Sequence, residues 1–63
     1  MSINTDDLIG MTKQDAITKI KEVEMTYMIT EENGKSLPCF DNIDRQRVKL
    51  VIGMDRVLKA SIG

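Results

Sequence analysis

The sequence predicts a small α+β domain in which one helix packs on a mixed β-sheet and a long loop stays exposed. Three observations favour this fold class: a capped amphipathic segment near the N-terminus, alternating segments near the C-terminus, and a long turn-rich stretch between them. At 63 residues, we expect a single domain over residues 1–63, with a core close to the lower limit for independent folding.

The helix is predicted within residues 10–24. Thr12 supplies an N-cap, and Asp15 stands three residues later, which is a carboxylate variant of the capping box. The apolar residues that follow recur at helical spacing: Ala16, Ile17, Ile20 and Val23. They form one stripe, and this stripe is expected to cover the sheet.

Three strands are predicted, at residues 25–30, 47–52 and 56–62. In the last of them, Leu58, Ala60 and Ile62 are expected to share one face. The connection over residues 31–45 is longer than an antiparallel hairpin needs and suits a parallel pair, which requires a crossover. We expect this connection to be an exposed loop anchored by Pro38.

Charge is distributed unevenly along the chain. Residues 1–44 carry a net charge of −5 and residues 45–63 a net charge of +4. One interpretation is a basic sheet face that is open to an anion. The other is a domain in which an acidic helix and loop offset the basic strands.

The segment "DRQRVKL" places Arg45, Arg47 and Lys49 at every second position, with Val48 and Leu50 interleaved. In a strand, alternate side chains point to the same face, so the three cations would project together. This basic row either braces another part of the protein or holds a foreign anion.

Two segments, "LIGMTKQDAITKI" and "RVKLVI", resemble the potato inhibitor I family of serine-protease inhibitors. The matching positions at the start are Leu8, Ile9, Gly10, Thr12, Asp15, Ala16 and Ile20, and the resemblance covers residues 8–63. It implies a potato inhibitor I-like fold whose exposed loop is presented to a protease. It also implies that Arg47 and Lys49 brace this loop from the strand beneath it.

The loop departs from the family pattern. Where the family offers a Thr, the primary specificity residue and an acid, this chain has Phe40, Asp41 and Asn42, and Asp enters most serine-protease specificity pockets poorly. Lys49 also stands where the family usually has an Arg, which alone can make a planar two-pronged contact. The sequence therefore predicts a retained scaffold with a degraded or redesigned inhibitory loop.

The favoured functional hypothesis is a non-catalytic protein that sequesters an anionic small molecule of the nucleotide class. An example is a virus-encoded sponge for a bacterial immune signal such as a cyclic dinucleotide. Cationic side chains would form hydrogen bonds with the phosphates of the ligand, and aromatic side chains would stack on its base. The candidate ligand-binding residues are Arg45, Arg47, Lys49, Lys35, Phe40 and Tyr27.

The alternative is a cytosolic serine-protease inhibitor that acts through residues 38–43. Its contact residues would be Pro38, Cys39, Phe40, Asp41 and Asn42. Nucleic acid is a weaker candidate partner, because the acidic helix and the near-neutral total charge oppose binding to a polyanion.

Neither an enzyme nor a cofactor or metal site is expected. The chain has no His and one Cys, so Cys39 lacks a histidine base and no zinc-ligand spacing exists. A cytoplasmic location is expected, because a lone Cys cannot form an internal disulfide and residues 1–10 lack the apolar run of a signal or membrane segment. The small core makes a homo-oligomer the expected state.

Overall fold

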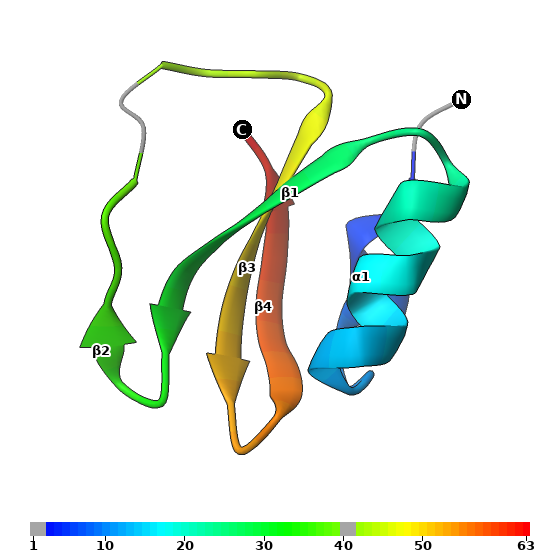
Figure 1. Cartoon of the computed structure of the whole chain (residues 1–63). Coiled ribbons are helices and arrows are strands. Elements are labelled where there is room, and N and C mark those ends of the chain that lie inside the picture. The colour runs from blue at the N-terminus through cyan, green and yellow to red at the C-terminus, as the bar shows by residue number, and fades with distance from the viewer. Residues whose placement is uncertain (1–2, 40–41) are drawn as a thin grey trace.

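The computed structural model describes residues 3–39 and 42–63. A short 3₁₀ helix η1 (Thr5–Leu8) and helix α1 (Lys13–Glu22) precede four strands, β1 (Thr26–Glu32), β2 (Lys35–Ser36), β3 (Arg47–Gly53) and β4 (Arg56–Ile62). The strand order is β2-β1-β3-β4; β1 and β3 are parallel and the other pairs are antiparallel. In Figure 1, β2 is the strand that lies farthest from α1. The predicted α+β class is confirmed.

Helix α1 begins at the predicted cap. The backbone N–H of Asp15 donates to Thr12 Oγ1 at 3.2 Å, which satisfies one of the donors that the first turn leaves free. Ala16 and Ile20 from the predicted apolar stripe are completely buried. After the helix, Glu24 adopts a φ of 60°, a left-handed conformation that turns the chain toward β1.

The core lies between α1 and one face of the sheet. Its buried apolar residues are Leu8, Ala16, Ile20, Met25, Val48, Leu50, Ile52 and Val57. In β3, buried Val48 and Leu50 alternate with half-buried Lys49 and Val51. Alternate residues of a strand point to opposite faces. The sheet therefore has a helix face, and an open face to which Lys49 and Val51 point.

Strand β4 contains a bulge that the alternating sequence did not predict. Val51 pairs with Lys59 and Ile52 pairs with Val57, so Leu58 is an additional residue. A Cβ placed on Gly53 would lie 2.6 Å from Leu58 Cδ1, which puts Leu58 on the open face. The expectation that Leu58 shares a face with Ala60 and Ile62 is therefore wrong, because the bulge shifts the alternation by one residue.

Strand β2 was not predicted either. Glu32 pairs with Lys35 across a turn made by Asn33 and Gly34, whose φ angles are 53° and 82°. Two consecutive left-handed residues define the tight hairpin turn that Asn-Gly favours. The predicted loop thus begins later than expected, because its first residues belong to this hairpin.

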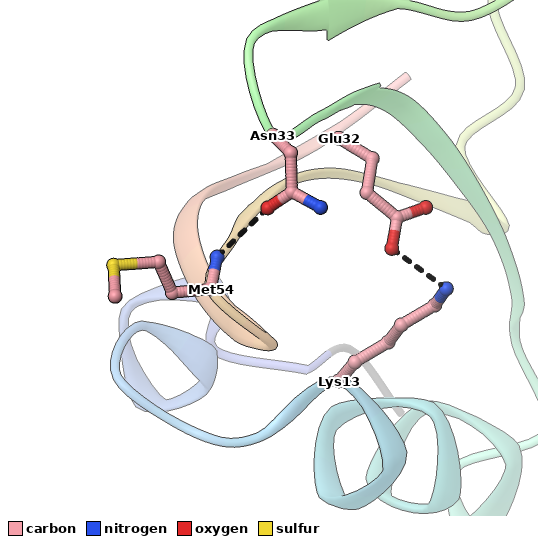
Figure 2. A network of polar contacts seen from close by, with 4 residues as sticks. All are labelled: Lys13, Glu32, Asn33 and Met54. Atoms are coloured by element: carbon pink, nitrogen blue, oxygen red, sulfur yellow. Dashed lines mark hydrogen bonds and ion pairs between the residues drawn. The ribbon is translucent and has the colours of Figure 1, made fainter.

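Polar contacts fix the end of the sheet where the turns lie (Figure 2). The side-chain oxygen of Asn33 accepts from the backbone N–H of Met54 at 2.9 Å, which joins the two hairpin turns. Lys13 at the start of α1 forms an ion pair with Glu32 at 3.0 Å. These contacts hold α1, β1 and the β3–β4 turn together, at the end of β3 away from Arg47.

Candidate functional site

Arg47 is a buried cation that binds backbone carbonyls. Its Nε and Nη2 donate to the carbonyl oxygen of Gly63 at 3.0 and 2.7 Å, and Nη2 also donates to the carbonyl oxygen of Asn42. Only 7% of the residue is exposed. A buried charge is stable only when its donors are satisfied. Arg47 therefore ties β3 both to the residue after β4 and to the loop. Lys49, the second brace that the family resemblance implies, makes no such contact among the described residues.

The loop over residues 37–46 is held by backbone contacts at both ends. The N–H of Leu37 donates to the carbonyl of Thr30 at 3.0 Å, and the N–H of Thr26 donates to the carbonyl of Gln46 at 2.8 Å. Pro38, which was expected to anchor the loop, is exposed. The anchors are therefore the residues that hydrogen-bond to β1.

The residues predicted to contact a protease lie on this loop. Pro38, Cys39 and Asn42 are exposed, and the Cys39 thiol donates to the carbonyl of Leu37 at 3.0 Å. Phe40 and Asp41 lie outside the described residues. The described part of the loop is thus accessible, and the Asn42 carbonyl is held by Arg47.

Arg45 does not belong to the predicted basic row. Strand β3 begins at Arg47, and Arg45 is an exposed residue of the preceding turn. Asp44 creates this turn: its side chain accepts from the N–H of Gln46 at 2.8 Å and its carbonyl from the N–H of Arg47 at 3.1 Å. Because such a turn interrupts the alternation, the prediction that three cations project together is wrong. The row on the strand consists of Arg47 and Lys49.

Lys49 differs from Arg47 in having no partner among the described residues. Its ammonium group makes no hydrogen bond or ion pair there. The side chain runs beside Gly63, where an added Cβ would lie 2.8 Å from Lys49 Cε and 3.0 Å from Nζ. The main chain at Gly63 thus lies close to the end of the lysine side chain, whose ammonium group has no partner among the described residues.

A groove of about 480 Å³ lies on the open face beside β4. Its lining residues are Ile9, Thr30, Lys49, Val51, Lys59, Ala60 and Ser61. The described lining contains two ammonium groups and two hydroxyls but no carboxylate. Strand pairing explains why they meet, because Lys49 is opposite Ser61 and Val51 is opposite Lys59.

The groove contains functional candidates that the sequence reasoning missed, namely Lys59, Ser61 and Thr30. The signal for two of them was present: Lys59 and Ser61 alternate in the last strand, as basic and hydroxyl residues facing the same way. Lys59 has no hydrogen-bond or ion-pair partner among the described residues. The Thr30 hydroxyl already donates to the carbonyl of Leu50 at 3.3 Å.

One carboxylate lies near the groove without lining it. Glu31 pairs with Val51 from the β1 side, so its side chain emerges on the open face across β3 from Lys59. The two lysines repel each other, and Glu31 offsets part of that repulsion. The lining of the groove is therefore cationic, and strand register places the acid Glu31 beside it.

Lys35 and Tyr27, two further predicted ligand-binding residues that the structure describes, do not converge on the groove. Lys35 lies on β2, at the sheet edge opposite β4. Tyr27 pairs with buried Val48 and therefore points to the helix face. Phe40 lies outside the described residues. Of the predicted ligand-binding residues that the structure describes, Lys49 alone lines the groove.

No protein-family model, curated protein or solved structure matches this chain. The resemblance to potato inhibitor I therefore stays a prediction. Within residues 3–39 and 42–63, no three His, Cys, Asp or Glu side chains gather to hold a metal ion, and no helix is long and apolar enough to span a bilayer. The fold and the site define a small α+β protein with a braced loop at one end and a cationic groove on its open face.

Proposed function

We propose that the protein sequesters an anionic small molecule of the nucleotide class in the open-face groove. The observation that carries this proposal is the meeting of Lys49 and Lys59, both without a protein partner among the described residues, in one hollow of about 480 Å³. Small-molecule sites typically have volumes of about 300–1,000 Å³. The groove is thus large enough for a nucleotide.

The groove offers chemistry for two parts of such a ligand. The ammonium groups of Lys49 and Lys59 would donate charge-assisted hydrogen bonds to phosphate oxygens, and the exposed Ser61 hydroxyl would add a neutral one. Val51 and Ile9 provide an apolar surface for a sugar or base. Because the phosphates supply the main attraction, affinity should fall as salt rises.

The proposed role is removal of a signal by binding. A protein that holds a signalling nucleotide, such as a cyclic dinucleotide used in bacterial immunity, lowers its free concentration without changing it chemically. A virus-encoded sponge would work in this way. Two phosphates in one ligand suit a groove with two cations, which favours a dinucleotide over a mononucleotide.

The proposal is tested by thermal-shift and calorimetric titration with cyclic dinucleotides and ADP-ribose. Ligand should raise the melting temperature of wild type by mass action. Lys49→Gln and Lys59→Gln should each weaken binding by about 1.5–3 kcal/mol, the range for a charged hydrogen bond. The matched control is Lys21→Gln on the exposed surface of α1, which should bind as wild type does. No shift with any of these nucleotides would contradict the proposal.

A second candidate function is serine-protease inhibition through the loop. It is favoured by the contact of Arg47 with the Asn42 carbonyl, since fixing a loop before binding reduces the entropy lost on binding. Asp41 argues against it, because it stands at the place of the specificity residue. We expect no nanomolar inhibition of trypsin-, chymotrypsin- or subtilisin-like proteases. Nanomolar inhibition that is lost on substitution within residues 39–42 would favour this function over sequestration.

A further inference from the structure

Strand β4 forms an edge of the sheet, and no described residue pairs with the outward backbone groups in its second half. The N–H of Gly63 donates to the carbonyl of Arg47 at 3.0 Å, so Gly63 belongs to the residues whose backbone faces β3. Residues that bond inward alternate with residues that bond outward in an antiparallel pair. Ser61 therefore bonds inward, while Ala60 and Ile62 direct their N–H and C=O groups away from the sheet.

The first part of β4 is covered on the same edge. The N–H of Gly10 donates to the carbonyl of Val57, and the N–H of Val57 donates to the carbonyl of Met11, both at 2.9 Å. The bulge at Leu58 follows directly. The open part of the edge is therefore the short segment from Lys59 to Gly63, and Ile62, 42% exposed, lies within it.

We propose that a second copy of this chain occupies this edge, with the two β4 strands antiparallel and the twofold axis at Ser61. In this register, Ala60 of each copy exchanges both backbone hydrogen bonds with Ile62 of the other. Every outward group between residues 60 and 62 is then paired. The twofold axis is perpendicular to the sheet, so the open faces of both copies lie on the same side.

The side chains fit this register. Ser61 faces Ser61 of the second copy, and Lys59 faces Gly63, so no like charges are directly opposed. On the helix face, Ile62 covers Ala60 of the second copy. A register centred on Ala60 would instead place Ile62 against the bulged Leu58, next to the covering segment of residues 10–11. The bulge and that segment limit the pairing to one short stretch, which favours a closed dimer over continued edge-to-edge growth.

The dimer would complete the groove, and this consequence rests on the proposed function. Lys49 is opposite Ser61 in each copy, so one row across the seam reads lysine, serine, serine, lysine. With neighbouring strands about 4.8 Å apart, the two Lys49 Cα atoms would lie about 14 Å apart. Lysine side chains can reach inward over most of that span. The composite site therefore fits one ligand with two phosphate groups, bound by the Lys49 and Lys59 side chains of both copies.

The pairing is expected to be weak without ligand. The interface is short, and it brings onto one surface four ammonium groups that have no partner among the described residues, so their repulsion opposes association. A ligand with two phosphates would offset that repulsion. Ligand binding and dimer formation should therefore strengthen each other.

The test is sedimentation equilibrium of the full chain with no ligand, with AMP, and with cyclic di-AMP, together with a calorimetric stoichiometry. Wild type should show a dimer at about 1 mM chain, as expected for a small interface. Cyclic di-AMP should tighten the dimer at least tenfold and bind one molecule per two chains, and AMP should tighten it less. Wild type that stays monomeric up to that concentration with and without cyclic di-AMP would overturn the inference.

Two variants address the edge directly. Ala60→Pro removes an N–H that points outward, so it should abolish the dimer while the melting temperature stays within a few degrees of wild type. Ser61→Lys places two ammonium groups at the twofold axis and should also yield a monomer, which keeps the test decisive if the proline variant fails to fold. Retention of a wild-type dimer by Ser61→Lys would overturn the proposed register.

Lys59→Gln separates the inference from the proposed function. It leaves the edge intact, so it should dimerise at least as well as wild type without ligand and bind cyclic di-AMP less tightly. If wild type binds cyclic di-AMP as a monomer at one per chain, the dimer inference fails and the proposed function stands. If wild type dimerises through Ala60 but binds no nucleotide, the pairing stands and both the composite site and the proposed function fail.

Discussion

Arg47 and Lys49 stand two residues apart on one strand and point to the same face, yet their surroundings are opposite. Arg47 is buried and donates to the carbonyls of Gly63 and Asn42. Lys49 is half-buried, and its ammonium has no partner among residues 3–39 and 42–63. Strand alternation decides to which face of the sheet a side chain points. The segments that pack on that part of the face then decide whether the side chain has a hydrogen-bond partner. Here one cation supports the fold, and the other is available to a ligand.

The largest expected loss of stability comes from a core residue, and it is the reference for the smaller effects at Arg47 and Lys49. Ile20 is completely buried between α1 and the sheet, so Ile20→Ala should lower the free energy of unfolding by about 2–5 kcal/mol through lost burial and a cavity. Urea unfolding followed by circular dichroism measures the change. A neutral result would mean that α1 does not pack on the sheet as described.

Arg47→Ala should come next, at about 3 kcal/mol, because it removes charged hydrogen bonds and leaves the buried carbonyl of Gly63 and the partly buried carbonyl of Asn42 without this donor. Arg47→Lys should recover part of this loss, since it keeps the charge but not the planar contact with Gly63. The matched control is Lys49→Ala, which should change stability by no more than about 0.5 kcal/mol. Equal losses for Arg47→Ala and Lys49→Ala would abolish the distinction between the two cations.

The N-cap of α1 lies far from both cations, and its removal should reduce stability less than Arg47→Ala does. Thr12→Ala removes the acceptor for the Asp15 N–H and should cost about 1 kcal/mol. Thr12→Ser should retain most of the stability, because its hydroxyl can accept the same bond. Nucleotide affinity should be the same in both variants, as measured by calorimetry. A loss of affinity would show that the groove depends on α1 in a way the present contacts do not explain.

The smallest effect concerns the acid near the groove. Glu31→Gln should strengthen anion binding by about 0.2–1 kcal/mol, the usual size of an interaction between exposed charges. The change should shrink at high salt. Weaker binding in this variant would place the ligand on a different part of the surface.

The sequence allowed the helix, its cap, three strands and the parallel arrangement to be predicted, because each follows from local spacing or from loop length. It did not reveal the bulge at Leu58, since a single inserted residue leaves the apolar spacing unchanged on either side. Asn33-Gly34 is a recognisable hairpin signal, but it stands at the start of a turn-rich stretch that the sequence alone does not divide into hairpin and loop. Such differences change the face to which single residues belong, and they do not change the fold class.

The site was harder to predict because its residues meet through strand pairing. Arg45 lies off the predicted row because the side chain and carbonyl of Asp44 accept from the N–H groups of Gln46 and Arg47 and form a turn. Lys59 became a neighbour of Val51 and Lys49 only through the register of β3 with β4. The alternation of residues within β4 does not specify which residues of β3 they pair with, because the bulge at Leu58 shifts the pairing by one residue.

The most direct test of the division between the two cations is a set of thermal melts with and without saturating cyclic di-AMP, on wild type, Arg47→Lys and Lys49→Gln. Arg47→Lys should melt below wild type and still gain stability from the ligand. Lys49→Gln should melt as wild type does and lose most of that gain. The opposite pattern would contradict the account: a low-melting Lys49→Gln that keeps the ligand effect, with an Arg47→Lys that melts normally and has lost it.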